Sequence, residues 1–182
     1  MRPAIALVFA AMLWACTSSD VPEPSGSSSV EDGAPFIRGC DSAVAGDVNM
    51  RNALTIGPLV LVGIPQAANL PRRAFMSHDG RYGSIKILAV VKGPSDVTVT
   101  VPEDQRSSVR LLYDPDARAH RHGFLLSAGD ERVTFEACPG IEAQYNGGFI
   151  ATMPTCLNLQ TQAEGLSASG WISLGAGSSC PD

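Results

Sequence analysis

Apolar and polar positions alternate in short runs along most of the chain, and this pattern predicts β-strands. The clearest run is 97–101, where Val and Thr alternate, and 132–137 alternates in the same way. A period of two is typical of a strand that buries one face. Together with the apolar runs that end near Gly, Pro or Asp, these give the predicted strands 54–62, 85–91, 97–101, 109–113, 123–127, 132–137, 148–152, 157–162 and 169–174.

Helices are expected to be few. Weak helical patterns cover only 42–51 and 67–76. Turn-forming residues join 123–127 to 132–137, so we expect a hairpin there. Many short antiparallel strands predict an all-β fold: a disulfide-stapled antiparallel β-sandwich, Ig-like or similar, with a β-barrel as the competing architecture.

The same pattern predicts which large side chains are buried and where the chain turns. Phe135 and Trp171 alternate within strands, so we expect both to fill the core. Asn146-Gly147-Gly148 is typical of a tight turn, because Asn and Gly adopt positive φ angles readily. The alternative interpretation of this tripeptide is a stretch of backbone that a ligand approaches closely.

The N-terminal pattern differs from the rest of the chain. Arg2 is followed by an apolar stretch over 4–14, then by Ala15 and Cys16. This order is typical of a lipoprotein signal peptide, although Trp14 occupies a place where a small residue is usual. The apolar stretch is shorter than the roughly 20 residues that span a bilayer. We therefore expect 1–15 to be a signal peptide and Cys16 to carry the lipid, including an acyl group such as palmitate.

A polar segment separates this signal from the strands. Residues 17–35 are rich in Ser, Pro, Gly and acidic residues, a composition that does not bury enough apolar surface to fold. We expect 16–35 to be the lipidated cysteine and a flexible tether, and 36–182 to be a single β-sandwich domain. The predicted location is extracytoplasmic, on the outer face of the cell membrane.

The cysteines support an exported protein. Setting Cys16 aside leaves an even number, which in an exported chain predicts two disulfides. If the last four strands run up and down, Cys156 and Cys180 lie at the same end, and Cys40 is left to pair with Cys138. Cys138–Cys156 remains the alternative if the 139–147 loop breaks that order. A four-thiolate zinc site is disfavoured because the chain has no C-x-x-C pair.

Composition excludes one class of partner. The formal net charge is −5 and the 13 basic residues form no long block. Because phosphate binding requires clustered Lys and Arg, we expect no nucleic-acid partner. Only two of the basic residues are lysines, and with the many Ala, Gly and Pro residues this indicates a GC-rich genome, such as that of an actinobacterium.

The C-terminal half carries a recurring pattern: Phe135-x-x-Cys138, then Gly147-Gly148-Phe149, then Pro154-x-Cys156-x-x-Leu159, and a terminal Cys180. Over about 111–180 it resembles a family of uncharacterised exported actinobacterial proteins, many of them lipoproteins. The resemblance implies an extracytoplasmic β-rich domain and assigns no mechanism.

Candidate chemistry is sparse. His120 and His122 lie two residues apart and, with His78, could form a metal site; Met76 beside that histidine raises copper as a variant. We otherwise expect no metal and no cofactor. The chain has no G-x-S-x-G motif, and pairing of the cysteines removes a thiolate nucleophile. The sequence thus predicts a protein that is not an enzyme.

The longest irregular stretch, 66–83, is the predicted binding loop, because long loops in compact domains often carry function. Its candidate residues are Arg72, Arg73, His78, Asp79, Arg81 and Tyr82. The leading hypothesis is a lipid-anchored, non-catalytic cell-envelope module that binds an envelope protein or another ligand. A metal-binding or metal-delivery lipoprotein is the first alternative, and an envelope hydrolase is the second.

Overall fold

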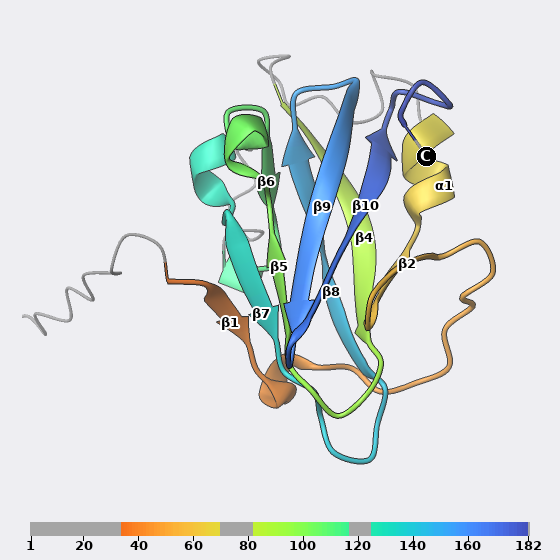
Figure 1. Cartoon of the computed structure of the whole chain (residues 1–182), viewed down its shortest axis with the longest axis vertical. Coiled ribbons are helices and arrows are strands. Elements are labelled where there is room, and N and C mark those ends of the chain that lie inside the picture. Colours follow the sequence, from red (N-terminus) through yellow and green to blue (C-terminus); the bar gives the residue numbers. More distant parts are fainter. Residues whose placement is uncertain (1–33, 70–81, 117–124, 182) are drawn as a thin grey trace, which may run out of the picture. The chain divides into compact units, whose positions relative to one another are not determined.

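Two five-stranded sheets make up the computed structural model, which describes residues 34–69, 82–116 and 125–181 (Figure 1). In sheet A the order is β1 (Phe36–Arg38), β7 (Arg132–Phe135), β5 (Val97–Thr100), β9 (Thr155–Ala163) and β10 (Leu166–Leu174). In sheet B it is β2 (Leu54–Ile56), β3 (Leu59–Val62), β4 (Gly83–Val91), β8 (Ala143–Ala151) and β6 (Val109–Leu111). The helical elements are α1 (Ile64–Asn69) and the short 3-10 turns η1 (Cys40–Ser42), η3 (Glu103–Gln105) and η4 (Leu126–Ala128).

The facing sides of the two sheets enclose one core. Phe135 of β7 lies within it, 1% exposed, as the sequence predicts. The ring of Tyr113 meets Phe135 edge-on at 4.8 Å, and the ring of Tyr145 is tilted against it at 5.1 Å. These aromatic rings come from both sheets and from the segment after β6, so they join the two layers.

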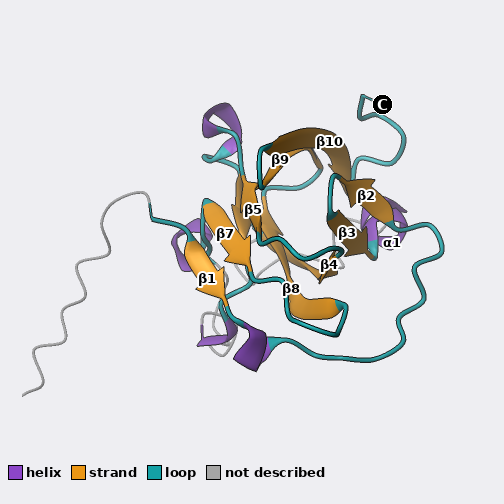
Figure 2. Cartoon of the chain, turned by 60° about the horizontal axis from the view of Figure 1, so that its bottom comes forward, coloured by secondary structure: helices purple, strands orange, loops and turns teal. Residues whose placement is uncertain are grey.

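The sheets also meet along one side. Figure 2, turned to bring the bottom of the chain forward, shows them curving around the core, with β10 beside β2. At that seam a Cβ on Gly170 would lie 2.9 Å from Ile56 Cγ1, so glycine leaves room for the isoleucine. Helix α1 packs next to β10, where the Gly175 N–H donates to the Ala67 carbonyl oxygen at 3.0 Å. The predicted β-sandwich is confirmed, and its sheets approach each other along this seam.

Several predicted strands have different bounds. The run 54–62 is two strands, β2 and β3, because Gly57 has a φ of 58° and begins a turn before Pro58. The run 148–152 is the second half of the longer β8. The three-residue β1 was not predicted, and it pairs with β7 in parallel, an exception to the predicted antiparallel arrangement.

Two predictions in loops and helices are wrong over the described residues, and a third, the helix 67–76, is confirmed over 67–69. The described part of the predicted strand 123–127 includes the start of the 3-10 turn η4. The predicted hairpin between 123–127 and 132–137 is not formed over the described residues, because β7 pairs with β5 and β1 instead. Within 42–51 only Ser42 belongs to a 3-10 turn, and Val44 instead forms a bridge to Gln144. The helix α1 begins at Ile64, earlier than the predicted 67–76, whose second part lies outside the described residues.

The predicted turn at Asn146-Gly147-Gly148 is also wrong, because all three residues lie in the middle of β8. The two glycines serve close approach: a Cβ at Gly147 would overlap the Tyr113 ring, and one at Gly148 would overlap the carbonyl oxygen of Ile85. Neither glycine has a positive φ, so space and not backbone conformation requires glycine here.

Both predicted disulfides are confirmed. The long-range disulfide joins Cys40 to Cys138 with a Cα–Cα distance of 5.6 Å, and the C-terminal disulfide joins Cys156 to Cys180 at 5.4 Å. The assumed run of four strands is wrong, since β8 belongs to the other sheet. The pairing holds nevertheless, because β9 and β10 form an antiparallel pair and the parallel β1 and β7 both end near their cysteines.

Candidate functional site

Most residues that the sequence singles out lie outside the described residues. These are Cys16, Arg72, Arg73, His78, Asp79, Arg81, His120 and His122. Tyr82 is described; it is partly exposed and directly precedes β4. Over 34–69, 82–116 and 125–181, no three His, Cys, Asp or Glu side chains come together as metal ligands. In the same ranges no helix is long and apolar enough to cross a membrane.

The structure instead brings together polar side chains on the solvent side of sheet A. Strand pairing aligns them in three rows that cross the sheet. We call these rows the polar face. The first row is Ile37, Thr134, Thr98, Gln162 and Ser167; the second is Arg132, Thr100, Gln160 and Ser169; the third is Asn158 and Trp171.

Strand alternation explains why these residues share one side. On β9 the buried positions Leu157, Leu159 and Thr161 alternate with Asn158 and the glutamines, of which the glutamines are exposed. Because successive strand side chains point to opposite sides, the polar residues must face solvent together. The core pattern therefore dictates the polar face.

A groove of about 330 Å³ runs across the polar face. Thr161 and Ala168 contribute to its lining, but the Thr161 hydroxyl turns inward and donates to the carbonyl oxygen of Ile56 at 3.3 Å. The side chains that face the groove are all uncharged and can both donate and accept hydrogen bonds. They are Thr100, Gln160, Gln162, Ser167 and Ser169.

Within the described part of the chain, none of those five side chains is hydrogen-bonded to another protein group. By contrast, Thr98 and Thr134, which continue the first row away from Gln162, share a hydrogen bond of 2.9 Å between their hydroxyl oxygens. The groove side chains thus have donors and acceptors without a partner in the described protein, whereas the neighbouring Thr98 and Thr134 are hydrogen-bonded to each other.

The prediction that Trp171 fills the core is wrong. It is not in the core: Ile172 and Leu174 occupy the buried positions of β10, and Trp171 alternates with them and is partly exposed. It pairs with Asn158 in the row next to Gln160 and Ser169. An aromatic side chain therefore flanks the groove at one end.

Near the Trp171 end of the groove, the 3-10 turn η3 lies along β9 where β5 stops. Beyond Thr100 strand β5 no longer pairs with β9, and Gln105 takes its place. The Asn158 N–H donates to Gln105 Oε1 at 2.9 Å, and Gln105 Nε2 donates to the Cys156 carbonyl oxygen at 3.1 Å. The backbone of β9 is therefore paired along the groove, so that over β9 a ligand can contact only side chains; β10 beside it is the edge strand of sheet A.

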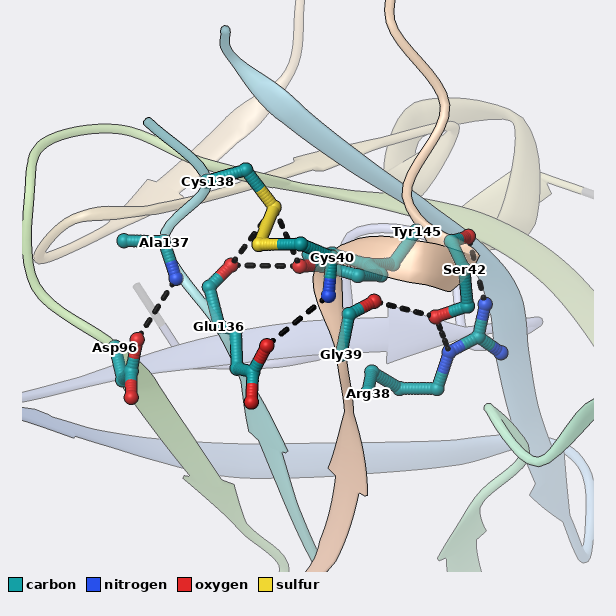
Figure 3. The surroundings of a disulfide bond; sticks show 9 residues. All are labelled: Arg38, Gly39, Cys40, Ser42, Asp96, Glu136, Ala137, Cys138 and Tyr145. Carbon is teal, nitrogen blue, oxygen red and sulfur yellow. Dashed lines mark hydrogen bonds between the residues drawn. A yellow bond between two sulfur atoms is a disulfide. The ribbon is translucent and has the colours of Figure 1, made fainter. Parts of the chain in front are cut away.

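The opposite edge of sheet A is fixed by the corner shown in Figure 3. The Cys40 N–H donates to Glu136 Oε2 at 3.0 Å, and the Ala137 N–H donates to Asp96 Oδ1 at 2.8 Å. The Tyr145 hydroxyl donates to the Glu136 carbonyl oxygen at 2.6 Å. Burial, and then the charge of Glu136, raise the pKa of Tyr145 to about 12, so this donor stays protonated.

Arg38 completes that corner. It is 4% exposed, and its guanidinium donates to the Ser42 hydroxyl at 3.1 Å and to the Tyr113 carbonyl oxygen. It also lies 5.7 Å from the centre of the Tyr145 ring, a cation–π distance. These contacts and the long-range disulfide hold β1 against β7, which identifies the corner as a structural support of the polar face.

Asp130 is a second group whose acidity is perturbed. Burial raises its pKa to about 6, and the charge of Asp114 adds to the rise. Its backbone pairs with Leu111 next to sheet B, outside the polar face. We therefore assign Asp130 to stability and not to the groove.

Comparison of the chain with protein-family models, with curated proteins and with solved structures finds no match. The resemblance to exported actinobacterial proteins accordingly stays a prediction.

The sequence carried a signal for this site that strand prediction passed over. In 98–100, 158–162 and 167–171 the positions between core residues are Thr, Asn, Gln, Ser and Trp, with no charged side chain. Predicting strands uses the inward positions, whereas the site is made of the outward ones.

Proposed function

We propose that this protein is an exported, lipid-anchored, non-catalytic binding module of the cell envelope whose ligand binds at the polar face of sheet A. The observation that carries the proposal is the groove itself, where five uncharged side chains offer donors and acceptors that no other described protein group uses. A rigid sheet that presents uncommitted hydrogen-bonding groups is suited to recognition.

The two disulfides indicate an extracytoplasmic protein, because such bonds persist in oxidising compartments. The lipid anchor at Cys16 is the finer part of the proposal. A tether of about 20 residues in the random-coil regime would hold the domain on the order of 25 Å from its lipid. That spacing suits a module that binds material close to the membrane surface.

Replacing Cys16 tests the anchor. In cells that process lipoproteins, the wild-type chain should fractionate with membranes, since two or more acyl chains hold a protein stably. Cys16→Ser should be released or remain as unprocessed precursor, whereas the neighbouring control Thr17→Ser should behave as wild type. Normal processing and membrane retention of Cys16→Ser would exclude lipid attachment at this residue.

Binding to isolated envelopes tests the polar face. The full chain, purified in detergent, should sediment with envelopes from its own host, and Gln160→Ala/Gln162→Ala should reduce the bound fraction. Thr55→Ala is the control, because Thr55 is an exposed, uncharged side chain on β2 of sheet B, outside the polar face and the predicted binding loop. Equal binding by the double variant and the control would remove the polar face from the proposal.

A further inference from the structure

We propose that the ligand of the polar face is a neutral polysaccharide chain of the envelope; this inference rests on the proposed function. Its basis is the match between uncharged amide and hydroxyl side chains in the groove and the hydroxyl groups of sugars. Each of the five groove side chains both donates and accepts hydrogen bonds, as every sugar hydroxyl does.

Charge complementarity favours a neutral ligand. Among the described residues, no charged side chain lines the groove. Arg132, the charged member of the polar face, lies beside it on β7, paired with Thr100 in the second row. Anionic polymers are bound through Arg and Lys, whose charge compensates for the lost hydration of the anion. A groove lined by hydroxyls and amides gives an anion no such compensation, so it selects uncharged polyols.

The pairing of β9 argues against a peptide. Extended peptides commonly add to the open edge of a sheet through backbone hydrogen bonds. The groove lies over β5, β9 and β10. At its centre β9 pairs with β5 on one side and β10 on the other, and Gln105 occupies the stretch that β5 leaves. β10 is the edge strand of sheet A, and its outer side lies beside β2. Recognition over β9, where Gln160 and Gln162 lie, must therefore use side chains, which suits a polymer whose own hydrogen-bonding groups are hydroxyls.

Trp171 supplies the apolar part of the contact. Sugar rings carry C–H groups on their faces as well as hydroxyls at their rims, and an indole ring combines a large apolar surface with a polar N–H. Trp171 lies one row beyond Ser169 and Gln160 and is partly exposed. A chain in the groove can place one sugar against this indole while its neighbours bond to the glutamines.

The size of the groove suits a segment of a polymer. About 330 Å³ is at the lower end of the range of roughly 300–1,000 Å³ that is usual for small-molecule sites. The groove is an open depression on a sheet face, so a longer chain can continue beyond it in both directions. We expect each polymer to contact several copies of the module weakly.

Affinity electrophoresis of the full chain through gels that contain a polysaccharide tests the inference directly. The probes are neutral polymers (an α-glucan, a β-glucan, a mannan and a galactan) and anionic polygalacturonate. At least one neutral polymer should retard the wild type. Gln160→Ala/Gln162→Ala should weaken that binding at least tenfold, since each lost hydrogen bond costs about 1 kcal/mol and 1.4 kcal/mol is a factor of ten.

The control variant is again Thr55→Ala, which should bind as wild type. Both groove glutamines are exposed, so an unchanged melting temperature of the double variant separates loss of binding from loss of fold. Retardation by polygalacturonate alone, or equal retardation of the double variant and the wild type, would overturn the assignment.

Treated envelopes separate this inference from the proposed function. Periodate cleaves vicinal diols of sugars, and protease removes protein partners. Loss of envelope binding after periodate, with binding retained after protease, supports a polysaccharide. Loss after protease alone overturns the polysaccharide but leaves a binding module. Absence of binding to untreated envelopes and to every polymer overturns both.

Discussion

Gly147 offers the sharpest test of how this core is packed. It lies in β8, and a Cβ there would overlap the ring of Tyr113, which is 1% exposed. The Tyr113 hydroxyl donates to the Ile87 carbonyl oxygen at 3.1 Å, and its ring meets Phe135 edge-on. In Gly147→Ala the tyrosine must move, and both interactions are strained or lost.

The magnitude follows from these contacts. A buried hydrogen bond is worth about 1 kcal/mol, an aromatic pair about 1 kcal/mol, and overpacking costs about 2 kcal/mol. Alanine in a strand recovers about 1 kcal/mol relative to glycine. We therefore expect Gly147→Ala to lower the free energy of unfolding by about 3 kcal/mol, measured by urea denaturation with the disulfides intact.

A double-mutant cycle isolates the cause. In a Tyr113→Ala background the ring atoms that the new Cβ would overlap are absent, so Gly147→Ala should no longer destabilise the protein. Gly148→Ala is the control, because its Cβ would meet the backbone oxygen of Ile85 and its cost should persist in both backgrounds. If Gly147→Ala costs the same with and without Tyr113, the explanation by close approach is refuted.

Three further predictions concern stability. Replacing both cysteines of the long-range disulfide by Ser should lower the free energy of unfolding by about 4.7 kcal/mol, because the sequence separation is 98. The same change at the C-terminal disulfide, with a separation of 24, should cost about 3.4 kcal/mol. The reverse order in denaturant titrations would contradict the loop-entropy account. Because the folded-state pKa of Asp130 is raised from 3.8 to about 6, its protonated form favours folding below pH 4 and this stability is lost as pH rises through 6. Asp130→Asn should match wild type at pH 4 and exceed it at pH 7 by about 1.5 kcal/mol, after allowance for partial exposure; an equal difference at both pH values would count against this. Finally, added zinc or copper should leave the melting temperature unchanged, and a rise that disappears when His78, His120 and His122 are replaced by Ala would instead favour the metal-binding alternative.

Local alternation predicted most of the strands because each buries one face against a shared core. It also led to the Cys156–Cys180 pairing, since these cysteines flank an antiparallel pair whose register places Thr155 opposite Leu174. Cys40–Cys138 followed only because those two cysteines remained. The assignment of strands to sheets could not be obtained in this way. β8 and β9 are neighbours in sequence but belong to different sheets, and nothing in their alternation distinguishes a hairpin from a crossing between sheets.

The errors arise where a tertiary contact overrides a local preference. Asn146-Gly147-Gly148 has the composition of a turn, but its glycines make room for the Tyr113 ring and for the backbone of β4. β1 has only three residues and an exposed Ile37, so its sequence shows no strand periodicity. The strand is recognised only from its parallel pairing with β7 and from the buried Arg38. Such contacts join residues about 35 to 100 positions apart, beyond the reach of a local pattern.

The candidate site shows a different limit, because its residues are the outward half of correctly predicted strands. Surfaces of soluble domains carry about 25–35% charged residues, so three or so of the eleven residues on the polar face would be charged on an ordinary surface. Only Arg132 is charged, and none of the five groove residues is. Strand propensity favours Thr and disfavours Lys and Glu, but it also disfavours Asn and does not favour Gln or Ser. Charged side chains on this surface would improve solubility and protect against aggregation. Uncharged amides and hydroxyls in register over three strands are therefore better explained by a ligand than by the fold, and the outward positions of β-strands merit the same pattern analysis as the inward ones.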